Sequence, residues 1–170
     1  HPRVRRQRQM CIRDRNNSSL KNRYRLMWMD AVYEPGEVKV VAYNKEGKAV
    51  AEKVVRTAGK AHHIELVSNR NELTADGKDL AYVTVKVVDK DGNLCPTDNR
   101  QINFSAKGTG KYRAAANGDP TNLEQFHLPK MHAFNGMLTA IIQAGETAGE
   151  IVFTAKANGV KAGNIRIQTK

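Results

Sequence analysis

The amino-acid sequence predicts an all-β protein, in which an immunoglobulin-like β-sandwich follows a partial β-domain. The first observation is a period of two: residues 80–89 alternate apolar and polar side chains, as a strand with one buried face does. The second is the spacing of turn signals, which divide residues 61–170 into about seven strand-like segments. The third is that no stretch of useful length repeats apolar residues at the helical period.

Residues 21–60 are predicted to be the C-terminal part of a truncated β-sandwich domain. Residues 24–29 are strand-like, and two segments rich in β-branched residues, 37–43 and 49–56, flank a turn at residues 45–48. The block holds about three or four strands, whereas a sandwich is built from about seven. The first half of that domain is therefore expected to lie upstream.

Residues 61–170 are predicted to form one complete immunoglobulin-like, invasin-like sandwich. The Asp-Gly pair at residues 91–92 and the Asn-Gly pair at residues 158–159 predict tight turns. Residues 120–135 contain two prolines and mixed polarity, so a long loop is expected there. The predicted strands cover residues 62–67, 80–89, 101–107, 137–144, 151–155 and 165–167.

The positive charge of the chain is concentrated at its start. Residues 1–25 hold nine of the 28 Lys and Arg residues and one of the 17 acidic residues, so they carry +8 of the net +11. Residues 1–20 have few apolar side chains, which predicts a disordered segment. Their string RQRQMCIRDR also resembles a translated sequencing-adapter sequence, so this head is expected to be non-native. Nucleic acid is therefore not the expected partner.

Several classes of protein are excluded by what the chain lacks. No apolar run approaches the ~18 residues of a membrane span. Two cysteines, Cys11 and Cys95, make neither a disulfide framework nor a metal set. Residues 89–93 resemble the start of a calcium loop, but the sixth and twelfth positions are Leu94 and Arg100, so a hairpin turn is expected. No catalytic residue, metal ligand or cofactor is predicted.

Four blocks of residues 23–170 resemble the C-terminal accessory domains of glycoside hydrolase family 2 β-galactosidases of the Bacteroides type. They occur in the same order and spacing as in that family. The blocks are RLMW and YEPGEVKVVAY within 25–43, AEK and RTAG within 51–59, VDKDGNLCP at 88–96, and NGDPT with AFNG at 117–121 and 133–136.

The resemblance implies a parent hydrolase and a non-catalytic segment. In that family two Glu residues of an upstream (β/α)₈ barrel act in a retaining mechanism, with their carboxyl groups ~5–5.5 Å apart. The 170 residues leave no room for a barrel. The expected partners are the catalytic barrel and other domains of the same parent chain, together with galactoside-containing glycans. The family also implies a periplasmic or extracellular location.

One loop is the candidate binding site. Asn117-Gly118-Asp119-Pro120 is typical of a structural turn, because Gly reaches positive φ and the polar side chains bond the nearby backbone. The functional interpretation is a loop that contacts sugar or docks a domain. Its predicted contact residues are Asn117, Asp119, Phe126, Phe134 and Asn135.

Two other functions stay open at the level of sequence. Residues 60–107 are similar to a bacterial immunoglobulin-like repeat of the invasin sort, which favours an adhesin-type repeat of a surface protein. A native basic head would instead favour a nucleic-acid binder whose affinity falls steeply with salt.

Overall fold

The computed structural model describes residues 32–170, which form strands and connecting loops without any helix. Predictions for residues 1–20 and for a strand at 24–29 lie outside the described residues. The chain divides into two compact units between Thr57 and Ala58. Residues 32–170 contain no helix that could span a membrane.

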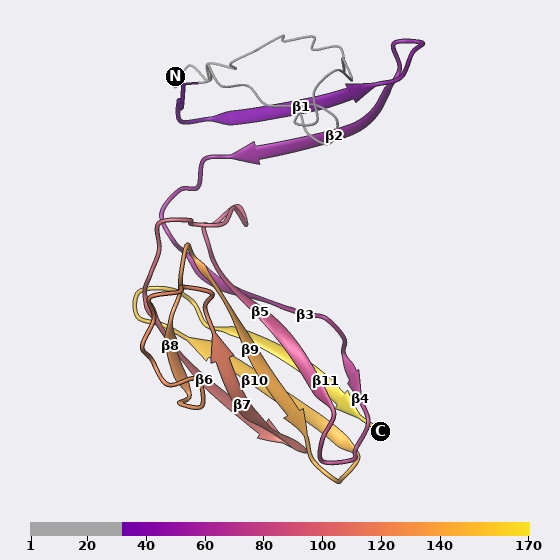
Figure 1. Cartoon of the computed structure of the whole chain (residues 1–170), viewed down its shortest axis with the longest axis vertical. Helices are drawn as coiled ribbons and strands as arrows, with labels where there is room; N and C mark the ends of the chain where they lie inside the picture. The colour runs from indigo at the N-terminus through magenta and orange to yellow at the C-terminus, as the bar shows by residue number, and fades with distance from the viewer. Residues whose placement is uncertain (1–31) are drawn as a thin grey trace. The chain divides into compact units, whose positions relative to one another are not determined.

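The described part of unit one is a hairpin (Figure 1). Strand β1 (Glu37–Tyr43) pairs antiparallel with β2 (Ala49–Arg56). The side chain of Asn44 closes the turn, since its Oδ1 accepts from the amide of Lys48 at 2.9 Å. One face of the hairpin carries two ion pairs, Lys39–Glu52 at 2.6 Å and Glu37–Arg56 at 2.8 Å. The two predicted strands and their turn are confirmed.

Unit two is a sandwich of two sheets, as predicted (Figure 1). The four-stranded sheet has the order β3-β5-β9-β7, with β3 (His63–Ser68), β5 (Leu80–Val88), β9 (Met137–Ala144) and β7 (Gly110–Ala116). The five-stranded sheet has the order β4-β11-β10-β6-β8, with β4 (Glu72–Leu73), β11 (Gly163–Thr169), β10 (Gly149–Lys156), β6 (Gln101–Gly108) and β8 (Lys130–His132).

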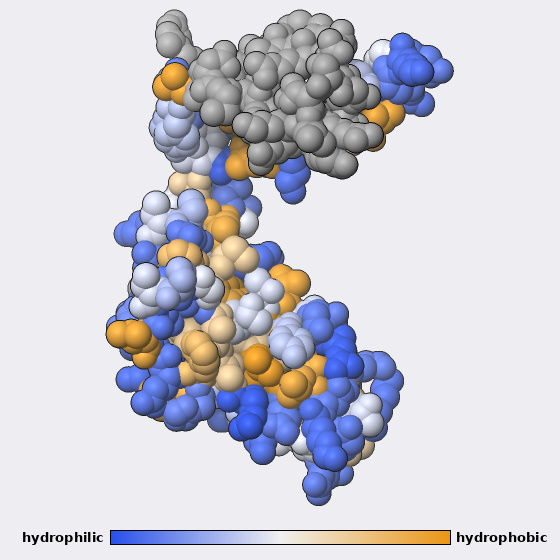
Figure 2. Space-filling model, in the orientation of Figure 1, coloured by the Kyte–Doolittle hydropathy of each residue, from blue (hydrophilic) through white to orange (hydrophobic). Residues whose placement is uncertain are grey.

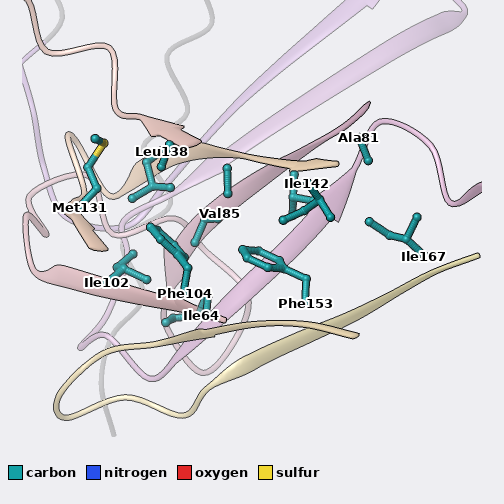
Figure 3. Packing of buried hydrophobic residues seen from close by; sticks show 14 of the residues in the cluster. Ile64, Ala81, Val85, Ile102, Phe104, Met131, Leu138, Ile142, Phe153 and Ile167 are labelled. Atoms are coloured by element: carbon teal, nitrogen blue, oxygen red, sulfur yellow. The ribbon is translucent and has the colours of Figure 1, made fainter. Parts of the chain in front are cut away.

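The core lies between the two sheets, where the inward positions of the alternating strands meet (Figure 3). Phe153 of β10 is fully buried, and Phe104 of β6 stacks on it with ring centroids 5.9 Å apart. Phe104 also stacks on Tyr112 of β7, with a centroid distance of 5.4 Å. These three aromatic rings therefore join the two sheets directly.

The structure adds strands that the sequence did not predict. Unit two has nine strands, β3 to β11, and three of them, β4, β7 and β8, lie outside the predicted strand ranges. A bulge between Tyr112 and Ala114 breaks the period of two in β7. The sequence predicts a loop over residues 120–135, but within that range residues 130–132 pair with residues 101–103 of β6. A three-residue strand with one inward side chain, Met131, shows no period of its own.

The hairpin turn predicted at residues 89–93 is confirmed, and a buried carboxylate holds it together. Asp89 is only 4% exposed. Its Oδ2 accepts from the amide of Gly59 at 2.8 Å and from Nδ2 of Asn93 at 3.0 Å. Its Oδ1 accepts from the amides of Asp91 and Asn93. These hydrogen bonds hold the pKa of Asp89 well below its usual range. The bond from the Gly59 amide has the largest effect, and the bond from the Asn93 side chain has the next largest.

The Asp89 contacts predict a specific loss of stability in acid. A carboxyl group of the unfolded chain titrates near pH ~3.9. The stabilisation by the ionised Asp89 is therefore fully present above about pH 4 and is lost as the pH falls toward the lower native pKa. We expect Asp89→Asn to be less stable at pH 7 and to lose less stability than the wild type on acidification. Urea unfolding followed by circular dichroism at pH 7 and pH ~3 measures both; equal losses in the two proteins would contradict the assignment.

Candidate functional site

The candidate site is the loop of residues 117–129, which runs from β7 to β8 and is fixed along its return arm. The amide of Ala115 donates to the carbonyl of Phe126 at 2.8 Å, and the amide of Phe104 donates to the carbonyl of Pro129 at 2.8 Å. The hydroxyl of Tyr112 lies 2.7 Å from the carbonyl oxygen of Leu128. The loop is thus tied to one strand of each sheet.

Asn117 and Asp119 lie together, and most of their polar atoms serve the loop itself. Asn117 accepts from the amide of Asp119 at 3.1 Å and donates through Nδ2 to the carbonyl of His132 at 3.0 Å. Asp119 Oδ1 accepts from the amide of Thr121 at 2.8 Å and from its hydroxyl at 2.7 Å. The Thr121 amide and hydroxyl hold the pKa of Asp119 below its usual range. The predicted structural turn is confirmed.

Two apolar side chains project from this fixed loop. Phe126 is 57% exposed and Leu123 is 96% exposed. The sequence prediction included Phe126 but not Leu123. An apolar side chain on a polar loop has no periodic pattern around it, so Leu123 carried no signal that could have separated it from a buried residue.

Phe134 and Asn135 belong to a different turn, between β8 and β9. Phe134 bridges to Met137 across Asn135 and Gly136, which both have positive φ, at 52° and 76°. These values define a tight hairpin turn in which Asn and Gly are favoured. The amide of Asn135 donates to Oδ1 of Asn99 at 3.2 Å. Within the described residues, no hydrogen bond joins Asn135 to residues 117–126.

A contact between Glu124 and His132, which the sequence does not predict, braces the loop against β8. Glu124 accepts through Oε2 from the amide of His132 at 3.0 Å, and its Oε1 lies 2.9 Å from Nδ1 of the same residue. Partial burial opposes ionisation of Glu124, but the hydrogen bonds from the His132 amide and ring outweigh it and lower the pKa. The spacing of eight residues between an acidic residue and a histidine does not predict a contact between them, because the contact depends on how the loop folds back.

Tyr112 gives a direct test of how the loop is held. Burial raises the pKa of Tyr112 to about 12, so its hydroxyl is a neutral donor at ordinary pH. We expect Tyr112→Phe to cost about 0.5–1.5 kcal/mol and to speed chymotrypsin cleavage at Leu123 and Phe126. Tyr82→Phe is the matched control, since no hydrogen bond of the Tyr82 hydroxyl is found in residues 32–170. Equal cleavage of all three proteins would argue against anchoring by the Tyr112 hydroxyl.

The two carboxyl groups of this loop are not poised to donate a proton. The pKa values of Asp119 and Glu124 are both lowered, so neither carboxyl group is protonated near neutral pH, as a general acid must be. In the part of the chain that the structure describes, no group of three His, Cys, Asp or Glu side chains could hold a metal ion. The exposed ring of Phe126 offers an apolar face for contact with a ligand or another domain.

Comparison with protein families decides what kind of domain this is. The model of Glycoside hydrolase family 2 C-terminal domain 5 matches residues 64–166, which cover nearly all of unit two. The chain belongs to this family. A second model, a domain of unknown function (DUF4982), matches residues 7–51 and so extends over β1 and part of β2.

Two curated relatives of this family 2 domain are β-galactosidases. Beta-galactosidase BoGH2A of Bacteroides ovatus is 42% identical over 138 residues, a match that covers 81% of this chain. A beta-galactosidase of Thermoanaerobacter pseudethanolicus is 32% identical over 126 residues and matches 74% of this chain. The matched segment spans only 16% of the first relative and 15% of the second.

Solved structures agree with the sequence relatives. A glycosyl hydrolase family 2 member from Bacteroides cellulosilyticus superposes with a TM-score of 0.76 at 31% identity, over 82% of this chain and 18% of that one. The predicted resemblance to accessory domains of family 2 hydrolases from Bacteroides is therefore confirmed. The roles of Asn117, Asp119, Phe126, Phe134 and Asn135 in contacting sugar stay predictions.

Proposed function

We propose that this chain is a non-catalytic accessory region of a longer glycoside hydrolase family 2 enzyme that cleaves β-galactosides. The observation that carries the proposal is the match to BoGH2A, which is 42% identical over 138 residues yet spans only 16% of that β-galactosidase. In such an enzyme, unit two packs against or flanks the catalytic barrel and other domains of the same polypeptide. The parent enzyme is proposed to act in the periplasm or outside the cell, which fractionation of the source cells tests.

The test is a comparison of two proteins from the same gene. The protein encoded by the complete open reading frame and the 170-residue chain are each assayed with a chromogenic β-galactoside and, in parallel, with a β-glucuronide. We expect β-galactoside turnover by the longer protein and none by the 170-residue chain. Turnover by the short chain that a Glu→Gln substitution within it abolishes would overturn the non-catalytic assignment. A reading frame without a hydrolase domain would overturn the proposed parent.

A finer proposal is that the loop of residues 117–129 contacts a galactoside weakly. It is supported by the exposed ring of Phe126, which can cover the C–H face of a sugar, and by the polar groups of Asn117 and Asp119 nearby in the sequence. Titration of galactose and lactose, followed by NMR of the 170-residue chain, should shift the resonances of these residues. Phe126→Ala should abolish the shifts, whereas Phe134→Leu, at the separate β8–β9 turn, should retain them if the site is confined to this loop. No shift at millimolar sugar would remove the sugar-contacting role and leave the accessory role untouched.

A further inference from the structure

The two outer faces of the unit-two sandwich differ in chemistry. The outer face of the five-stranded sheet is polar and internally bonded: Arg166 pairs with Glu150 at 2.8 Å, and Thr154 donates to Asn164 at 2.7 Å. Such a face is suited to water. Among the outward positions of β6, β10 and β11, Val152 is the one apolar residue.

The outer face of the four-stranded sheet instead has an apolar centre. The strand register places Tyr82 of β5 opposite Ile141 of β9, and Ile141 opposite Ala114 of β7, so these three form one row across the sheet. The adjacent row runs Val67, Thr84, Thr139 and Ala116. Tyr82 is 46% exposed and Val67 is 44% exposed. Figure 2 shows apolar residues gathered over β5, β9 and β7, with polar residues around them.

Charged side chains border this apolar centre. At one end Lys86 pairs with Glu65 across β5 and β3 at 3.2 Å. On β7, which is an edge strand, Lys111 and Arg113 are both exposed. Neither takes part in an ion pair within residues 32–170. The surface therefore has an apolar middle, a neutralised end and a basic edge.

We infer that this outer face of the β3-β5-β9-β7 sheet docks against another folded domain of the same longer polypeptide. The inference rests on the proposed function. An apolar centre with a polar rim is the usual composition of a protein interface, and an exposed apolar patch marks such a site. The partner surface has an apolar middle and carboxylates that meet Lys111 and Arg113. A longer polypeptide of this kind contains other domains that can provide this surface, because the matched segment is only 16% of the length of BoGH2A.

A second copy of the chain fits this face less well. In a two-fold dimer the same patch meets itself, so the patch must supply both members of each complementary pair. Within residues 32–170, Glu65 is the only carboxylate that strands β3, β5, β9 and β7 carry, and it already pairs with Lys86. A self-pairing face therefore leaves Lys111 and Arg113 without partners, whereas a different domain can provide the carboxylates.

Hydroxyl-radical footprinting tests the inference on the protein in two lengths. The 170-residue chain and the product of the complete open reading frame are oxidised under the same conditions and analysed by mass spectrometry. We expect Tyr82, Ile141 and Val67 to be labelled in the short chain and to lose labelling in the longer protein. Val152, on the outer face of the five-stranded sheet, should be labelled equally in both. Equal labelling of Tyr82 in both lengths, or protection of Tyr82 that depends on the concentration of the short chain, would overturn the inference.

Matched variants complete the test. Ile141→Glu should restore labelling of Tyr82 in the longer protein, and Val152→Glu, the same change on the opposite outer face, should not. If Ile141→Glu prevents folding of the short chain, Lys111→Glu with Arg113→Glu at the exposed edge serves instead, with the same expected result. The β-galactoside assay on the same longer protein separates the two ideas. Activity without protection of Tyr82 refutes only the docking face, and protection without glycosidase activity refutes only the proposed enzyme.

Discussion

Replacing Phe153 by alanine will lower the free energy of unfolding of unit two by about 3–5 kcal/mol, the usual cost of truncating a buried phenylalanine. Phe153 is fully buried and stacks on Phe104, which in turn stacks on Tyr112 of the other sheet. The substitution therefore removes the end of an aromatic column that joins both sheets, and it leaves a cavity that the rigid strands close only in part. Urea unfolding followed by circular dichroism measures the change.

A second phenylalanine provides the control for this prediction. Phe126 is 57% exposed on the loop before β8, so Phe126→Ala should change the free energy of unfolding by about 0.5 kcal/mol or less. The contrast separates loss of core packing from loss of an aromatic side chain as such. Similar destabilisation by both substitutions would contradict the description of the core.

Replacing Gly108 by alanine is expected to destabilise unit two by about 2–5 kcal/mol, the sum of backbone strain and overpacking. Gly108 ends β6 with a φ of 100°, in the region that side chains rarely adopt. A Cβ at this position would also lie against the backbone oxygen of Glu150, far inside van der Waals contact. Because that oxygen belongs to the neighbouring strand β10, it cannot move aside without opening the sheet.

A substitution at Gly118 measures the cost of backbone strain without the cost of overpacking. Gly118 has a φ of 78°, but a Cβ there would meet nothing within 4 Å. Gly118→Ala should therefore cost only about 1–2 kcal/mol, from the left-handed backbone alone. Both variants are compared with the wild type by thermal and urea unfolding. A loss for Gly108→Ala no larger than that for Gly118→Ala would show that the contact with Glu150 is unimportant.

The long strands and their buried faces were predictable because alternation is a local property of the chain. Residues 80–88 and 137–144 show it clearly, and each places every second side chain in the core. The shorter strands were not predictable in this way. β7 contains a bulge, and β8 is three residues long, so their assignment depends on hydrogen bonds to β9 and β6 rather than on their own sequence.

The candidate loop shows the same division. The turn at residues 117–121 was predictable, since Asn117 and Asp119 bond backbone groups only two residues away. The anchors of the loop were not, because Tyr112 reaches the carbonyl of Leu128 and Glu124 reaches His132 through the folded path of the chain. The sequence predicts Phe134 and Asn135 as contact residues of the same site, but they form the separate β8–β9 turn.

By itself, the sequence determined the all-β class, the inward residues of the long strands, the tight turns and the membership in a family of glycoside hydrolase accessory domains. All of these depend on residues close together in the chain or on blocks that keep their order. Only the tertiary structure decided which sheet carries an apolar outer face. The row of Tyr82, Ile141 and Ala114 comes from three strands, and its continuity depends on the register between segments about 30–60 residues apart, which no local pattern encodes.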